Sequence, residues 1–127
     1  MKYLFVITAL MITISANSQA RLGSKAEDIF QEFAEQGIEY SGTKDEMYLV
    51  YYFNDNLIIQ YYFDKDSICD KVLIQTFNQE MTDFLFDTYE TRGYFKTNEG
   101  WLPRKNGIIY KIAHQVEKDG TNYFLWY

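Results

Sequence analysis

The stretch from Tyr48 to Phe77 constrains the fold most strongly, because it contains three apolar runs rich in β-branched and aromatic residues. Short polar breaks separate these runs at residues 54–56 and 64–67. Runs of this length and composition, cut by turn-forming residues, are typical of antiparallel strands joined by hairpins. The sequence therefore predicts a three-stranded meander over Tyr48–Phe53, Leu57–Phe63 and Ile68–Phe77.

Two amphipathic helices are predicted on either side of this meander, at Ser24–Gln36 and Gln79–Arg92. Ser24 and Glu27 have the spacing of a capping box, and apolar residues then recur every three or four positions. Asn78 is the expected N-cap of the second helix, and Gly93 its C-cap. Each helix carries a single apolar stripe, so both are expected to pack on the same face of the sheet.

The C-terminal part predicts further strands. Ile108–Glu117 alternates between apolar and polar residues, and the Asp119-Gly120 pair is typical of a hairpin turn leading into Asn122–Tyr127. Thr97–Asn106 contains the only proline and predicts a loop that carries Trp101, and Tyr94–Lys96 allows a further short strand.

These elements predict an α+β domain in which an antiparallel sheet of five to six strands has two helices packed on one face, in the order α-β-β-β-α-β-β. The alternative is two smaller helix-plus-hairpin units side by side, as in the fold that β-lactamase inhibitor proteins resemble. Direct pairing of Ile108–Tyr127 with the meander would distinguish the single sheet from the two units.

The first twenty residues have the features of an export signal. Lys2 is followed by an apolar run over Tyr3–Ile14, too short to span a bilayer, and Ser18-Gln19-Ala20 has the small-x-small pattern of a cleavage site. The alternative is a buried first strand or helix. We expect a signal peptide over 1–20, a single domain over 21–127, and a mature protein in the periplasm or secreted.

Composition excludes several classes of partner and chemistry. The formal charge is −6, and −7 once Lys2 is removed, which opposes binding to nucleic acid and to anionic membranes. No second apolar run is long enough for membrane insertion of the mature chain. Cys69 is the only cysteine, so an internal disulfide is impossible. Its acidic neighbours disfavour a thiolate, and we expect a buried, inert thiol.

No motif for catalysis, a metal or a cofactor stands out. The stretch Asp64–Asp70 contains three acids, as the start of a calcium loop does. A calcium loop that began at Asp64 would need glycine at its sixth position and glutamate at its twelfth, where this chain has Cys69 and Gln75, so a solvated turn is expected. His114, the only histidine, lies on the apolar face of a strand without the partners of a zinc site or a catalytic triad. We therefore predict no catalytic residue, metal or cofactor.

The aromatic content, 19% of the chain, is the one compositional excess. The first two strands do not alternate cleanly, so either both faces of the sheet are covered or the outer face keeps an aromatic patch. Tyrosine suits partner surfaces because its body is apolar and its tip is polar. The candidate binding residues are Tyr48, Tyr52, Tyr62 and Trp101.

The resulting hypothesis is an exported, non-catalytic binding module that recognises a protein or a glycan through the outer sheet face. The acidic charge favours a neutral or basic partner. The alternatives are an extracytoplasmic hydrolase, with His114 or paired carboxylates in a cleft, and a small-ligand carrier with an apolar cavity.

One resemblance rests on Tyr61-Tyr62-Phe63-Asp64, Cys69, Trp101 and Tyr110-Lys111-Ile112. With a helix between them, these residues resemble a family of small exported proteins of the Bacteroidota that have no assigned activity. The resemblance covers most of residues 21–127. It implies export and an α+β fold, and it transfers no functional residue.

Overall fold

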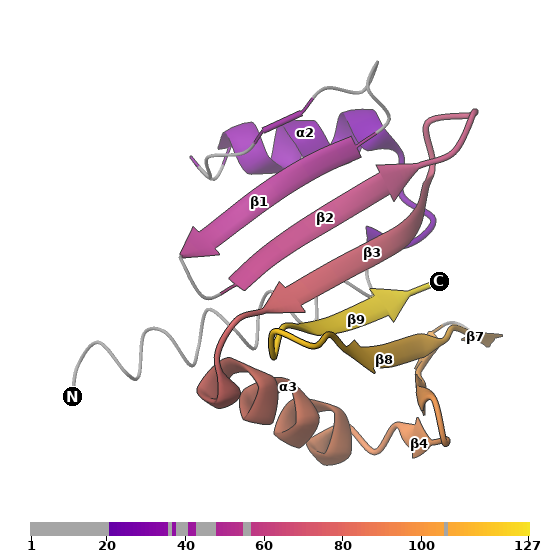
Figure 1. Cartoon of the computed structure of the whole chain (residues 1–127). Coiled ribbons are helices and arrows are strands. Elements are labelled where there is room, and N and C mark those ends of the chain that lie inside the picture. Colours follow the sequence, from indigo (N-terminus) through magenta and orange to yellow (C-terminus); the bar gives the residue numbers. More distant parts are fainter. Residues whose placement is uncertain (1–20, 36, 38–40, 43–47, 55–56, 106) are drawn as a thin grey trace.

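The computed structural model describes residues 21–35, 37, 41–42, 48–54, 57–105 and 107–127, and for 48–54 and Lys105 it describes the backbone alone. The predicted export signal lies outside the described residues. The described part contains two α-helices, α2 (Ala26–Glu35) and α3 (Gln79–Thr91), shown in Figure 1. Its strands are β1 (Tyr48–Asn54), β2 (Leu57–Phe63), β3 (Cys69–Thr76), β4 (Phe95–Lys96), β5 (Gly100–Leu102), β6 (Arg104–Lys105), β7 (Ile108–Ile109), β8 (Ile112–Val116) and β9 (Asn122–Trp126).

Seven of these strands form one antiparallel sheet in the order β1-β2-β3-β9-β8-β5-β4. The C-terminal strand β9 pairs directly with β3, with Leu73 opposite Leu125. This pairing confirms a single sheet and excludes two separate helix-plus-hairpin units. The predicted α+β class is confirmed, and the short strands β4 and β5 extend the sheet beyond the expected core of five or six.

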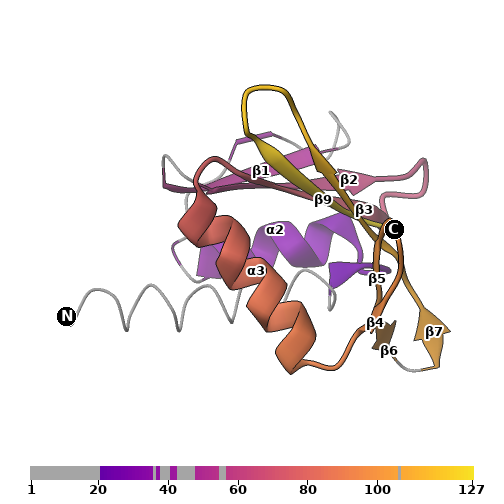
Figure 2. The ribbon, with the colours of Figure 1, turned by 60° about the horizontal axis from the view of Figure 1, so that its bottom comes forward.

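Both helices pack on the same side of the sheet, which we call the inner face (Figure 2). Burial along β2 alternates strictly, with Leu57, Ile59, Tyr61 and Phe63 buried. The ring of Phe33 in α2 meets Tyr61 edge-on, with the ring centroids 5.9 Å apart. Tyr89 in α3 contacts Phe124 of β9 at the same centroid distance. The opposite side of the sheet is called the outer face.

Aromatic side chains fill the core beneath α3. Tyr89 is fully buried, and its ring lies 4.9 Å from Trp101 and 5.7 Å from Trp126, measured between centroids. The Trp126 indole N–H donates a hydrogen bond to the Tyr89 hydroxyl at 3.3 Å. Burying a large ring contributes roughly 1.5–3 kcal/mol or more, so this cluster accounts for much of the stability of the C-terminal half.

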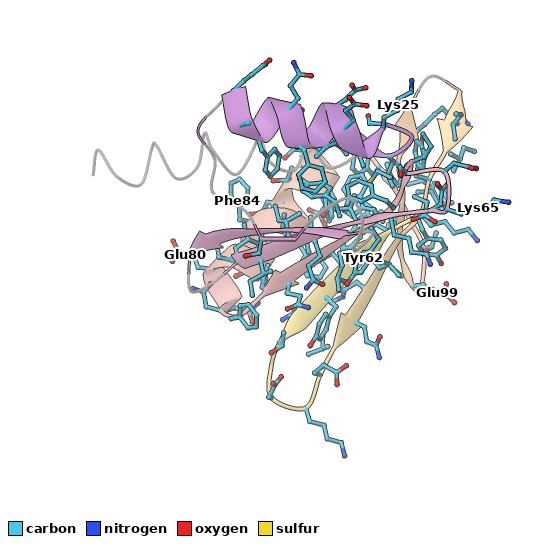
Figure 3. The ribbon with its side chains drawn as sticks, turned by 90° about the horizontal axis from the view of Figure 1, so that it is seen from above. Lys25, Tyr62, Lys65, Glu80, Phe84 and Glu99 are labelled. Carbon is cyan, nitrogen blue, oxygen red and sulfur yellow. The ribbon has the colours of Figure 1, made fainter. Side chains whose placement is uncertain are left out.

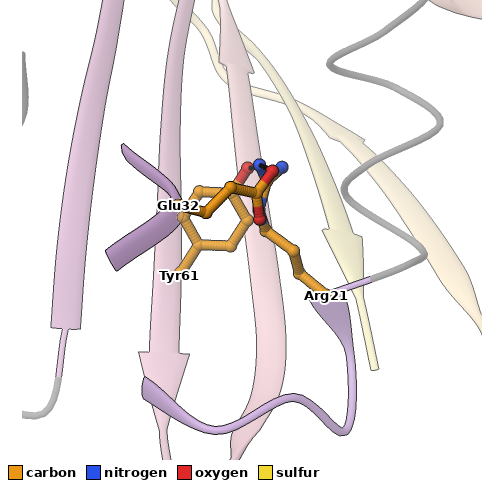
Figure 4. Close-up of polar contacts among 3 residues, drawn as sticks. All are labelled: Arg21, Glu32 and Tyr61. Carbon is orange, nitrogen blue, oxygen red and sulfur yellow. Dashed lines mark hydrogen bonds and ion pairs between the residues drawn. The ribbon is translucent and has the colours of Figure 1, made fainter. Parts of the chain in front are cut away.

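Arg21 joins α2 to the sheet through a buried guanidinium group (Figure 4). One terminal nitrogen pairs with the Glu32 carboxylate at 2.6 Å, and the other donates to the Tyr61 hydroxyl at 3.2 Å. The guanidinium carbon also lies 5.0 Å from the centre of the Phe33 ring. A charge this deeply buried needs such partners to offset the water it has lost.

Three of the helix and turn signals in the sequence, at Asn78, Gly93 and Asp119-Gly120, correspond to observed geometry. The Asn78 side chain accepts a hydrogen bond from the Met81 N–H at 2.8 Å, as an N-cap does. Gly93 has a φ of 71°, the left-handed conformation expected directly after a helix. The Asp119-Gly120 turn joins β8 to β9 as predicted, with Val116 opposite Asn122.

Two predictions between residues 97 and 117 are wrong. The expected loop at Thr97–Asn106 contains strands β5 and β6, and the single strand predicted at Ile108–Glu117 is split into β7 and β8. Strands β6 and β7 form their own two-stranded sheet, with Lys105 opposite Ile108. The two residues between that pair are Asn106 and Gly107, a sequence typical of tight hairpin turns, and Gly107 has a φ of 79°.

Candidate functional site on the outer sheet face

The outer face presents three rows of side chains that run across the strands. In the middle row, Gln60 lies opposite Leu73, Leu73 opposite Leu125, and Leu125 opposite Ala113. The two flanking rows hold tyrosine, glutamine, lysine and isoleucine: Ile58, Gln75, Tyr123 and Gln115 on one side, and Tyr62, Lys71, Tyr127 and Lys111 on the other. Neither α2 nor α3 covers this surface, because both pack on the inner face.

Tyr62 lies on this face and has its own local partner. Its neighbours Tyr61 and Phe63 are buried beneath α2, whereas Tyr62 is half-buried and points to the opposite side of the sheet (Figure 3). Its hydroxyl donates a hydrogen bond to the Gln60 side-chain oxygen at 2.7 Å. Partial burial raises the pKa of this hydroxyl, so Tyr62 presents a neutral ring and a polar tip.

The side chains of two other candidates, Tyr48 and Tyr52, lie outside the described part of the structure. The backbone places Tyr48 opposite Tyr62 and Tyr52 opposite Ile58. These two predictions therefore stay predictions.

Trp101 is not on a surface loop, which corrects the fourth candidate. It lies in β5 opposite Ile112, is 2% exposed, and directs its ring into the core against Phe86 and Tyr89. The burial follows from β5 pairing with β8, which turns the ring toward aromatic side chains of α3 and β9. Trp101 therefore cannot extend an exposed binding surface through its ring.

A concavity of about 400 Å³ opens at the β5–β8 end of the sheet. The middle row of the outer face shrinks from Leu125 to Ala113 and then to Gly100, so the side chains above this part of the sheet are small. The walls include Leu102, Lys111 and Tyr127 together with the turn at residues 97–99. Strand alternation assigns four of these side chains to the outer face: Leu102, Ala113, Lys111 and Tyr127. The concavity therefore continues that surface.

The electrostatics of the outer face differ from those of the whole chain. Among the side chains of the three rows the charged ones are Lys71 and Lys111, both exposed, and the wall of the adjoining concavity adds one acid, Glu99. The two helices on the other side of the sheet together hold eight of the eighteen Asp and Glu and no Lys or Arg. The helical side of the protein is therefore strongly acidic, and the three rows of the sheet surface are not.

His114 has the environment of a structural histidine. Its Nε2 atom is 2.7 Å from the Asn122 side-chain oxygen, and its ring stacks on Phe124 with a centroid distance of 4.8 Å. It lies on the inner face and does not line the concavity. Its backbone N–H donates a hydrogen bond to the Glu99 carbonyl at 2.8 Å, which ties β8 to the turn before β5.

Cys69 is buried, as expected, at the start of β3. Burial is the main reason that the pKa of its thiol rises to about 12. A thiol that stays protonated and inaccessible at neutral pH is neither a nucleophile nor a metal ligand. In the nearby turn, the Asp64 carboxylate accepts hydrogen bonds from the backbone N–H groups of Asp66 and Ile68, at 2.8 and 3.0 Å.

Several residues of the outer face were not among the predicted candidates. Tyr123, Leu125 and Tyr127 lie beside the β3 residues of the same face, because β9 pairs with β3. The sequence did contain a signal: Asn122–Tyr127 has aromatic residues at both odd and even positions. Successive residues of a strand point to opposite faces, so one of the two sets had to remain outside the core. The position of β9 at the centre of the sheet could not be read from that signal.

Comparison of the chain with protein-family models, with curated proteins and with solved structures gave no match.

Proposed function

We propose that this protein is an exported, non-catalytic binding module that recognises a protein or glycan partner through the outer face of its sheet. The observation that carries the proposal is the surface of tyrosine, leucine and isoleucine side chains, interspersed with glutamine and lysine, that neither helix covers. Soluble domains seldom keep contiguous apolar patches of this kind without a use.

The chemistry of the three rows supports a neutral, extended partner. Tyrosine rings offer flat apolar contact, and the glutamines at positions 60, 75 and 115 offer amide donors and acceptors without charge. The tyrosines with flanking amides suit stacking on sugar rings or packing against a protein surface. Lys71 and Lys111 would tolerate an acidic group on the partner, which broadens the neutral or basic partner expected from net charge alone.

The export part of the proposal is supported by the order of basic residue, apolar run and small residues in 1–20. The packing of the domain includes Arg21, whose side chain is buried. In the described part of the chain, no helix is both long and apolar enough to cross a membrane. We propose that the mature protein begins at Arg21 and functions in the periplasm or outside the cell.

We expect N-terminal sequencing of the protein recovered from periplasm or medium to read Arg21-Leu22-Gly23. Replacing Ala20 by a bulky residue should block cleavage, because signal peptidases need a small residue at that position. Recovery of soluble exported protein with an intact Met1 would contradict the proposed signal.

Truncation of the outer-face tyrosines should reduce binding without reducing stability. We expect Tyr62→Ala and Tyr123→Ala each to leave the thermal melting temperature nearly unchanged, since both rings are only half-buried. Either ring, if it is a hot spot, should weaken partner binding by about 2 kcal/mol. The measurements are thermal melting, capture from envelope extract and binding to a glycan array.

The matched control is Val116→Ala. Val116 is 57% exposed on β8, and its position in the strand belongs to the inner-face set rather than to the outer face. A captured partner counts as support only when both tyrosine variants lose it and the Val116 variant retains it. A large fall in melting temperature for both tyrosine variants would mean that the rings belong to the core, and the proposal would be wrong.

A further inference from the structure

The β6–β7 hairpin projects from the domain as a separate structural feature. Arg104 pairs with Ile109 and Lys105 with Ile108, and neither strand joins the seven-stranded sheet. A backbone hydrogen bond of 2.8 Å from Tyr110 N–H to the Pro103 carbonyl closes its base. Figure 2 places the hairpin at one end of the molecule, beside β4.

This hairpin exposes apolar side chains on both of its faces. Ile108 and Ile109 are 55% and 54% exposed, and successive residues of a strand point to opposite faces. A flat protein surface could cover only one of the two. An apolar medium that surrounds the hairpin would cover both, and the boundary region of a lipid bilayer is such a medium.

Positive charge is concentrated in the same segment. Residues 92–111 carry five of the twelve Lys and Arg of the chain and a single acid, Glu99, which gives a formal charge of +4 in a chain of −6. Arg104, Lys96 and Lys111 are exposed. Charges further away than about 8–10 Å are largely screened at physiological ionic strength, so this end of the protein presents a cationic surface despite the acidic helices.

We propose that the β6–β7 hairpin docks the protein onto the surface of an anionic lipid membrane. Ile108 and Ile109 enter the boundary between headgroups and acyl chains, and Arg104 with its cationic neighbours pairs with lipid phosphates. Phe95, 70% exposed on β4 at the same end, supplies a second apolar contact. This is attachment at the surface by a local cationic segment, which the net charge of the whole chain had argued against.

The first test is co-sedimentation of the purified protein with two kinds of vesicle. One kind is pure phosphatidylcholine, and in the other phosphatidylglycerol replaces part of it. We expect binding to the anionic vesicles, a loss of binding as salt is raised, and little binding to the neutral vesicles. The double variant Ile108→Ser/Ile109→Ser should bind at least about tenfold more weakly, because it removes the apolar contact on both faces of the hairpin.

The control is Val116→Ser, which removes an equally exposed β-branched side chain from the turn end of β8. It should bind like the unmodified protein, and all three proteins should melt at similar temperatures because the altered side chains are exposed. Equal binding by the hairpin variant and the control would overturn the proposal. So would absence of binding to anionic vesicles, which would instead assign the hairpin to a protein partner.

A second measurement reports insertion directly. Trp101 and Trp126 are 2% and 0% exposed, so their fluorescence should not respond to vesicles. In the variant Ile108→Trp, we expect a blue shift of the emission on adding anionic vesicles and quenching by brominated lipid. An emission spectrum that does not change would overturn insertion. None of these results bears on Tyr62 or Tyr123, so the outer-face proposal is tested separately.

Discussion

Replacing Trp101 with alanine is expected to destabilise the protein by about 3–5 kcal/mol, the usual cost of removing a large buried ring. Trp101 is 2% exposed, and its ring centroid lies 5.0 Å from Phe86 and 4.9 Å from Tyr89. Alanine would leave a cavity at the junction of α3, β5 and β9. Urea unfolding followed by circular dichroism measures the change, and a loss of this size would leave much of the protein unfolded near physiological temperature.

Two conservative substitutions, Trp101→Phe and Trp126→Phe, distinguish the contribution of ring packing from that of the indole hydrogen bond. Within the described residues the Trp101 indole nitrogen has no hydrogen-bond partner, whereas that of Trp126 donates to the Tyr89 hydroxyl. Trp126→Phe should therefore cost about 1 kcal/mol more than Trp101→Phe, because it also breaks a buried hydrogen bond. If Trp101→Ala proved nearly neutral, the ring would be on the surface, as the sequence alone had suggested, and the packing described for β5 would be wrong.

Gly100→Ala is expected to be the most damaging of the small substitutions. A Cβ atom at position 100 would lie 1.8 Å from the carbonyl oxygen of Ile112, well inside contact distance, and the obstacle is backbone that cannot rotate away. The two strands would have to separate, so we expect a loss of about 3 kcal/mol or more, at or above the upper end of the cost of overpacking a core. The measurement is the free energy of unfolding in urea.

Gly93→Ala is the matched control. Nothing lies within 4 Å of a Cβ atom at Gly93, and the expected cost there is the roughly 1–2 kcal/mol of a left-handed backbone. A glycine replaced without strain would instead stabilise the protein by about 0.4–1 kcal/mol through the unfolded chain. Stabilisation by Gly100→Ala would therefore contradict the close approach of β5 to β8.

The outer-face and hairpin proposals make different demands on the same domain. Binding through Tyr62 and Tyr123 uses a broad surface at the centre of the sheet, whereas membrane docking uses Ile108 and Ile109 at one end. A protein attached to a membrane by its hairpin could still present the outer face to a partner. Variants at one surface are expected to leave binding at the other unchanged, because the altered side chains do not touch.

Local signals in the sequence were sufficient for most of the secondary structure. The apolar runs and polar breaks of the meander, the N-cap at Asn78 and the turn at Gly120 each depend on residues within a few positions of one another. The sequence of β2 does not alternate cleanly between apolar and polar residues. This alone predicted that its outer side is either covered by other elements or remains an apolar surface. Such features need no knowledge of the distant chain.

The position of Trp101 was decided by tertiary structure alone. The proline and glycines around it indicate a loop, and only the pairing of β5 with β8 turns the ring into the core, against α3 and β9. The same limit applies to the hairpin, although Asn106-Gly107 was a signal that could have been read. Whether Ile108 continued into β8 or turned back on β6 depended on which partner strand was within reach.

The sequence determines the net charge of the protein, whereas the fold determines where the charges lie. Composition determined that the chain is acidic, with 18 Asp and Glu against 12 Lys and Arg. Only the fold placed the acids of α2 and α3 on one side of the sheet, and left Lys71 and Lys111 on the other and a cationic segment around the hairpin. A partner at close range responds to the charges within a Debye length and not to the sum over the chain, so the folded arrangement determines which partners each surface can bind.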